Sequence, residues 1–205
     1  MAGPATSYLR SIRAISVLVV HPKDRDAEDL LAQLRRIGCQ ASAVWPIPAD
    51  VPVGVRAVFL SIRPETLDSP QVRRLAQAGH AAMIGVTEYE NPATVEALLT
   101  VGAVAVVPKP IRAIGLLTTL ALALSVYDKA DASAKRIAKL ESRLTALKEI
   151  EQAKSILMAR SRLNEAQAYA VLRERAMARR VTVEEIARAV LAAHDILGID
   201  PPAGS

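Results

Sequence analysis

The sequence predicts an α/β domain built on a parallel β-sheet, followed by a long helix and a small all-α module. Short apolar runs alternate with helical stretches through residues 1–125, and parallel strands need helical crossovers of this kind. Beyond this point the apolar residues follow only helical spacing. We therefore assign residues 1–125 to the α/β domain, 126–150 to a helical linker and 151–198 to the all-α module.

Five apolar runs are the predicted strands. The first, AISVLVV at 14–20, is continuously apolar and rich in β-branched residues, which is typical of a strand buried on both faces. The other four are expected at residues 41–45, 57–62, 82–87 and 103–107. Helical patterns lie between the runs at residues 24–38, 70–79 and 91–102. A further helix is expected to begin near Ile111 and to continue into the linker.

Composition indicates a globular protein with aliphatic cores, since 51% of residues are hydrophobic and only 3% are aromatic. The single cysteine, Cys39, excludes an internal disulfide and fits a buried position in a reducing compartment. The longest uncharged apolar run, at 113–127, has 15 residues, whereas a membrane-spanning helix needs about 20. With no export signal recognisable, we expect a cytoplasmic protein that does not contact a membrane.

Polar residues at the predicted strand ends suggest a particular kind of α/β domain. Thr87 ends the fourth strand and Lys109 follows the fifth. This arrangement resembles a receiver domain of the flavodoxin-like, doubly wound type. The resemblance implies that the two side chains respond to a phosphoryl group on an aspartate at the end of the third strand. Ser61 stands at that position, and His21 stands where receivers carry a metal-binding acidic pair.

These departures predict a pseudo-receiver, a protein-interaction domain that does not accept phosphate. A serine cannot form an acyl phosphate, and a divalent cation lacks clustered carboxylate ligands. In the alternative, Asp24 or Asp26 retains metal binding and Ser61 is phosphorylated as an ester. We recognise no catalytic triad, zinc-ligand spacing or phosphate-binding glycine loop. We therefore expect no enzymatic activity, metal or cofactor.

The helical linker carries a short heptad pattern. Its a and d positions, flanked by charged residues, are Ile137, Leu140, Leu144 and Leu147. This is the seam of a coiled coil two heptads long, and an exposed helix of this kind is marginally stable alone. The pattern predicts a parallel homodimer, with packing of the seam on the chain's own C-terminal helices as the alternative.

The seam ends where the next a and d positions become the charged residues Glu151 and Lys154. The apolar stripe then shifts to Ile150, Ala153, Ile156 and Leu157. Two capping boxes, beginning at Asn164 and at Thr182, predict two further helices. The first is expected to bury Ala168, Leu172 and Ala176, and the second Val183, Ile186, Ala187, Val190 and Leu197.

Positive charge is concentrated in this module, because residues 154–180 contain seven basic and two acidic side chains. Such a cluster suggests a polyanionic partner, with a solvated charged face as the alternative. Tyr169 and Arg173 lie four residues apart, and a ring bordered by guanidinium groups suits an unpaired base and its phosphates. The candidate contacts are Lys154, Arg160, Arg162, Tyr169, Arg173, Arg179 and Arg180. In the alternative, Tyr169 is a half-buried core ring.

Two motifs make a resemblance specific. They are Ala153-Lys154-x-x-Leu157-Met158 and Ala168-Tyr169-x-x-Leu172-Arg173-x-x-Ala176-Met177. Together they resemble the ANTAR module, the RNA-binding domain of bacterial transcription antiterminators. Residues 14–195 are similar to family members that regulate amidase and nitrate operons, which also join a receiver-like domain, a coiled coil and this module.

The resemblance implies a dimeric antiterminator that binds paired stem-loops in an mRNA leader and prevents a terminator hairpin from forming. It also implies control by a cytoplasmic small-ligand sensor built like a periplasmic binding protein, and Ser61 and His21 favour such sequestration over phosphorylation. One alternative is a DNA-binding response regulator, although no glycine-containing turn separates the last two helices. Another is a scaffold that binds only a sensor protein.

Overall fold

The computed structural model describes residues 12–63 and 69–196. The chain divides into two compact units, Met1–Ala132 and Ser133–Ser205. Helix α5, Leu116–Ser161, contributes residues to both units. Each unit has its own buried core, so each is described separately.

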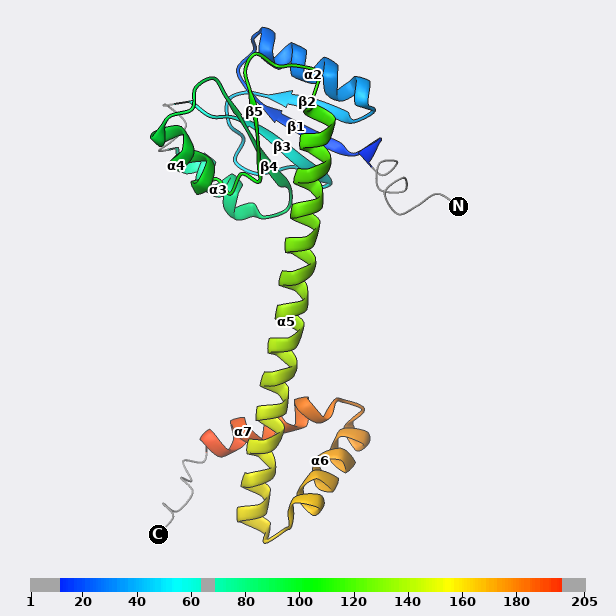
Figure 1. The fold of residues 1–205 in the computed structure, drawn as a ribbon. Helices are drawn as coiled ribbons and strands as arrows, with labels where there is room; N and C mark the ends of the chain where they lie inside the picture. Colours follow the sequence, from blue (N-terminus) through cyan, green and yellow to red (C-terminus); the bar gives the residue numbers. More distant parts are fainter. Residues whose placement is uncertain (1–11, 64–68, 197–205) are drawn as a thin grey trace. The chain divides into compact units, whose positions relative to one another are not determined.

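The N-terminal unit contains the predicted parallel sheet (Figure 1). Its strands are β1 (Ser16–Val20), β2 (Gln40–Val44), β3 (Val55–Ser61), β4 (Ala82–Thr87) and β5 (Ala105–Pro108). All neighbours pair in parallel, in the order β2-β1-β3-β4-β5. The expected strand positions are confirmed to within two residues at each end. This order is that of flavodoxin-like doubly wound sheets, whose ligand sites lie at the carboxyl ends of the strands.

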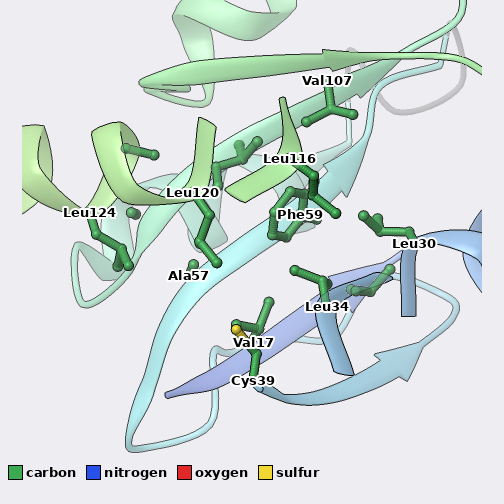
Figure 2. Packing of buried hydrophobic residues seen from close by; sticks show 14 of the residues in the cluster. Val17, Leu30, Leu34, Cys39, Ala57, Phe59, Val107, Leu116, Leu120 and Leu124 are labelled. Carbon is green, nitrogen blue, oxygen red and sulfur yellow. The ribbon is translucent and has the colours of Figure 1, made fainter. Parts of the chain in front are cut away.

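Helices cover both faces of the sheet. They are α2 (Arg25–Ile37), α3 (Pro70–Ala78), α4 (Pro92–Thr100) and the first part of α5. Leu30 of α2 and Leu116 of α5 pack on one face around Phe59, as Figure 2 shows. Val72 of α3 and Ala97 of α4 belong to a second cluster on the other face. The central strands β1, β3 and β4 are therefore buried on both sides, which explains their largely apolar sequences, whereas the edge strands β2 and β5 are partly exposed.

Local signals set the helix ends. The Asp24 side chain accepts a hydrogen bond from the Ala27 N–H at 3.0 Å and begins α2, and Gly38 ends it with φ 105°. The expectation that α5 begins near Ile111 is wrong, because the helix begins at Leu116. Gly115 has φ 92°, a conformation that a right-handed helix cannot include.

The C-terminal unit is a three-helix bundle. The end of α5 packs with α6 (Glu165–Arg179) and α7 (Val183–Ile196) around a core of Ala153, Leu172, Ala176, Ile186 and Ala187. The predicted core residues Ala168, Leu172, Ala176, Ile186 and Ala187 are buried, whereas Val183 and Val190 are partly buried and Leu197 lies outside the described residues. Small alanine side chains let the helix backbones approach closely.

Both predicted capping boxes are present. Asn164 Oδ1 accepts from the Gln167 N–H at 2.8 Å, and Gln167 Oε1 accepts from the Asn164 N–H at 3.0 Å. Thr182 and Glu185 make the same reciprocal pair at the start of α7. These bonds satisfy backbone N–H groups that lack partners at helix starts. Among the helices of residues 12–63 and 69–196, none combines the length and apolarity needed to cross a membrane.

Candidate nucleic-acid interface

One face of α6 presents polar and aromatic side chains to solvent. Tyr169 is 46% exposed, Arg173 is exposed, and Met177 is 70% exposed. Their four-residue spacing puts them on the same side of the helix. They border a shallow hollow of about 610 Å³, which is otherwise lined by Ala166, Ala170, Glu174 and Ala178.

The opposite side of α6 determines this orientation. Ala168, Leu172 and Ala176 are buried in the bundle core, so the helix cannot rotate without exposing them. Within the described ranges, neither the Tyr169 hydroxyl nor the Arg173 guanidinium has a hydrogen-bond or ion-pair partner in the chain. Both groups therefore remain available to an external ligand.

The other predicted arginines lie near the two ends of α6. Arg160 belongs to the last turn of α5 and Arg162 follows it, whereas Arg179 ends α6 and Arg180 is its C-cap. All four are exposed. Arg162 and Arg180 have φ values of 52° and 56°, in the left-handed region that costs a residue with a side chain about 1–2 kcal/mol. Backbone strain of this kind is enriched at functional sites.

Lys154, which the sequence suggests as an RNA contact, is largely covered in the structure. Its side chain is 8% exposed. The ammonium Nζ lies 2.7 Å from Glu151 Oε1 and 2.6 Å from Glu165 Oε1. The Glu151 contact has the i, i+3 spacing of a helix-surface pair, whereas nothing in the sequence pattern indicates Glu165 as a partner.

The predicted dimer seam is exposed. Ile137, Leu140, Leu144 and Leu147 each have 54–60% of their surface accessible. The alternative in which these residues pack on the chain's own C-terminal helices is therefore not realised in the structure. Four large apolar side chains along one helix remain available to another helix.

The carboxyl ends of the strands carry the receiver-like residues. Ser61 ends β3 and Thr87 ends β4, with 1% and 2% of their surfaces exposed. Lys109 follows β5 directly, and its backbone N–H donates to the Thr87 carbonyl at 2.8 Å. The three residues thus lie at neighbouring strand ends, where the receiver resemblance expects them.

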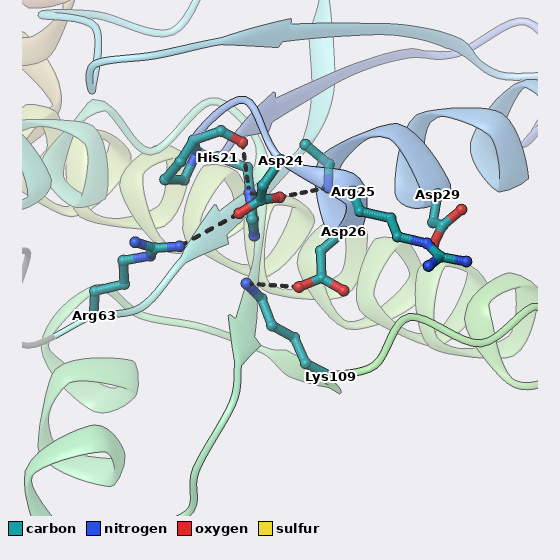
Figure 3. Close-up of polar contacts among 9 residues, drawn as sticks. His21, Asp24, Arg25, Asp26, Asp29, Arg63 and Lys109 are labelled. Atoms are coloured by element: carbon teal, nitrogen blue, oxygen red, sulfur yellow. Dashed lines mark hydrogen bonds and ion pairs between the residues drawn. The ribbon is translucent and has the colours of Figure 1, made fainter.

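Lysine and arginine side chains of this chain form ion pairs with the nearby carboxylates. Lys109 Nζ lies 3.1 Å from Asp26 Oδ2, and Arg63 Nη2 donates to Asp24 Oδ2 at 3.4 Å, as Figure 3 shows. Sequence reasoning missed Arg63, which reaches Asp24 across 39 positions of sequence. In the described ranges, no group of three or more His, Cys, Asp or Glu side chains could hold a metal ion.

His21 lies beside this cluster and is 1% exposed. Its Nδ1 lies 2.9 Å from the Pro22 carbonyl oxygen and 3.2 Å from Asp24 Oδ1. Both neighbours are acceptors, so the proton is assigned to Nδ1. Burial lowers the pKa of His21, and the charge of Lys109 lowers it further, against the opposing effects of Pro22 and Asp24. The imidazole is therefore neutral near pH 7.

Comparison with known proteins shows which protein families this chain is related to. The AmiR N-terminal family model matches residues 15–124, and the ANTAR domain model matches residues 138–191. The aliphatic amidase regulator of Pseudomonas aeruginosa is 30% identical over 201 residues, which cover 97% of this chain and 99% of that protein. The transcriptional regulatory protein PdtaR of Mycobacterium tuberculosis is 30% identical over 111 residues, 54% of each chain.

Among solved structures, the response regulator StyR has a TM-score of 0.55 at 16% identity, covering 86% of this chain and 98% of that one. This similarity shows a shared fold. The family models and the amidase regulator together cover both units and nearly the whole length. The chain belongs to the ANTAR family of transcription antiterminators, in the group whose N-terminal domain is of the AmiR type.

Proposed function

We propose that this protein is an RNA-binding transcription antiterminator that recognises hairpins in an mRNA leader. The observation that carries the proposal is the exposed stripe of Tyr169 and Arg173, which border a hollow and have no partner within the described residues. Stacking an unpaired base on an aromatic ring contributes about 1–3 kcal/mol. A guanidinium binds a phosphate through two parallel hydrogen bonds.

Hairpin loops are the form of RNA that such a surface fits. Their bases are unpaired and can stack on a side chain, whereas the bases of an A-form helix are inaccessible in its deep groove. The exposed arginines at both ends of α6 supply further phosphate contacts. A leader hairpin held in this way is unavailable for pairing into a terminator.

The N-terminal unit supports control by a partner rather than by phosphorylation. Ser61 replaces the phospho-accepting aspartate, and Asp24 and Asp26 are paired with Arg63 and Lys109. A small-ligand sensor of the periplasmic-binding-protein type that holds this unit would then be the source of the signal. The exposed seam of α5 supports a homodimer, which brings two ANTAR modules to paired hairpins.

Gel-shift titration provides the test, using the leader RNA of the adjoining operon and a duplex DNA of the same sequence. We expect tighter binding to RNA. Changing Tyr169→Ala and Arg173→Ala together should weaken RNA binding about 100-fold or more, from the loss of one stacked base and one phosphate contact.

The matched control is Arg36→Ala, an exposed arginine of the N-terminal unit, which should leave RNA affinity unchanged. Equal or tighter binding to the duplex would favour the alternative of a DNA-binding response regulator. Full RNA affinity in the double variant would place the binding surface elsewhere.

A further inference from the structure

Lys154 links two helices of the C-terminal unit. Its Nζ contacts Glu151, one turn earlier on α5, and Glu165, the first residue of α6. Both oxygens lie within 2.7 Å, which is the distance range of charge-assisted hydrogen bonds. A single ammonium therefore ties the first turn of α6 to α5.

The exposure of the three side chains shows which charge an approaching ligand meets. Lys154 is 8% exposed, whereas Glu151 and Glu165 are 65% and 71% exposed. The accessible charge around this ammonium is consequently negative. An RNA phosphate would meet two carboxylates before it reached the lysine, and it would displace at least one of them to form a contact.

Glu165 shares a side of α6 with the proposed RNA contacts. Residues 165, 169 and 173 follow one another at intervals of four, so their side chains form one stripe along the helix. The tie from Lys154 to Glu165 thus restrains the same stripe that carries Tyr169 and Arg173. If the first turn of α6 frays, the backbone before Tyr169 is no longer held against α5, although Leu172 and Ala176 still fix the rotation of the middle of the helix.

The tie acts together with the capping box that precedes α6. Asn164 and Gln167 satisfy the first backbone N–H groups, but they do not attach the helix to its neighbour. The bundle core attaches the middle of α6 through Leu172 and Ala176. Among the described residues, Lys154 supplies the one ion pair between α5 and the start of α6.

We infer that Lys154 is a positioning residue, which holds the start of α6 on α5 and so directs Tyr169 and Arg173 toward RNA without contacting phosphate. This inference depends on the proposed RNA-binding function. It predicts that loss of the tie weakens RNA binding even when the substitution removes a negative charge. A phosphate-contact role for Lys154 predicts instead that removal of this negative charge leaves RNA binding unchanged or makes it tighter.

Glu165→Gln in the full-length chain provides the decisive comparison, measured against the leader RNA of the adjoining operon. The variant removes a carboxylate from an exposed position and should fold normally. We expect RNA binding about fivefold weaker, from loss of one ion pair. Glu184→Gln is the matched control, because Glu184 lies in the first turn of α7 in the same bundle, outside the hollow, and has no ion-pair partner within the described residues. It should bind RNA as tightly as the unmodified chain, or slightly more tightly.

The salt dependence of binding gives a second readout, which a phosphate contact would change. Arg173→Ala should lower the slope of log affinity against log salt by about 0.7–0.9, the value for one phosphate contact. Lys154→Ala should weaken binding and leave that slope unchanged. Two results would overturn the inference. One is a fall in the salt slope for Lys154→Ala that equals the fall for Arg173→Ala. The other is unchanged or tighter RNA binding by Glu165→Gln.

Failure of the proposed function would look different. If neither the unmodified chain nor Glu184→Gln binds RNA, the antiterminator proposal fails. Hydrogen exchange of the α6 amides without RNA then still tests the tie, because exchange should be faster in Lys154→Ala and Glu165→Gln than in Glu184→Gln. Equal exchange in all three variants would contradict the positioning role.

Discussion

Individual charged residues of the pseudo-receiver are held by contacts within the chain. Asp24 caps α2, accepts from Arg63 and lies beside His21. Asp26 pairs with Lys109. An incoming cation would have to displace a lysine or an arginine from these carboxylates, and an incoming phosphoryl group would find that lysine already paired. The carboxylates and the basic side chains of this cluster are thus paired with one another.

The buried His21 predicts a pH-dependent stability for the N-terminal unit. Its pKa is lowered in the folded chain, so the unfolded chain binds more protons below about pH 6.5 and stability falls as the pH decreases. The slope for one group is at most about 1.4 kcal/mol per pH unit. Urea unfolding between pH 7.5 and 5, followed by fluorescence of Trp45, the single tryptophan, measures it.

His21→Asn should reduce this slope. The control is His80→Asn, at an exposed position in the same unit, which should keep the slope of the unmodified chain. An identical slope in all three proteins would show that His21 does not titrate in this range.

At the scale of elements, the close approach of α4 to β4 depends on one glycine. A Cβ added to Gly85 would lie 2.1 Å from Leu98 Cδ2, far inside van der Waals contact. Leu98 packs on the core between the sheet and α4. The absence of a side chain in the middle of β4 therefore lets α4 bury its apolar face against the sheet.

Gly85→Ala should lower the unfolding free energy of the N-terminal unit by about 1–3 kcal/mol, because Leu98 must leave its present position. Combining it with Leu98→Ala makes room for the new methyl group, so the double variant should be more stable than the sum of the single effects. Urea unfolding monitored by Trp45 fluorescence tests both statements. Strict additivity would indicate that Leu98 is not the obstacle.

At the scale of the whole molecule, α5 is the element that contributes to both compact units. Its exposed seam lies in the C-terminal unit, between Ile137 and Leu147. A single helix with this much exposed apolar surface is stabilised by a second one. The proposed dimer would place two copies of every functional surface in one particle.

Leu140→Glu combined with Leu144→Glu should therefore yield a monomer of 21.9 kDa, whereas the unmodified chain should have twice that mass by light scattering. Buried carboxylates at adjacent seam positions repel each other and lose hydration. Ser142→Glu adds the same charge to an exposed position off the seam and should remain dimeric. A monomeric unmodified chain would refute the dimer.

Sequence reasoning predicted the fold because its signals are local. Apolar runs located all five strands, and the Asn164 and Thr182 capping boxes located the starts of α6 and α7. The sequence does not locate the start of α5, because the residues before and after Gly115 have the same apolar character. The positive φ of Gly115 is what separates the preceding loop from the helix.

The site was less predictable because its contacts join distant residues. The pairing of Lys154 with Glu165 depends on the turn at Arg162, whose left-handed conformation no pattern indicates. Arg63 likewise meets Asp24 only through the sheet topology. The assignment of Tyr169 and the arginines as RNA contacts stays a prediction until binding is measured.

The continuity of α5 has a geometric consequence. The helix is uninterrupted from the seam residue Leu147 to the bundle residue Ala153. Because an α-helix turns by about 100° per residue, the number of residues between them fixes the angle between their directions around the helix axis. In the proposed dimer this fixed rotation determines the angle between the two RNA-binding faces. That angle in turn determines the spacing between the two hairpins that one dimer can bind. One residue inserted after Leu147 would turn both faces away, whereas seven would nearly restore them. Under the proposed function, the length of α5 between the seam and the bundle would therefore set the spacing of the two hairpins.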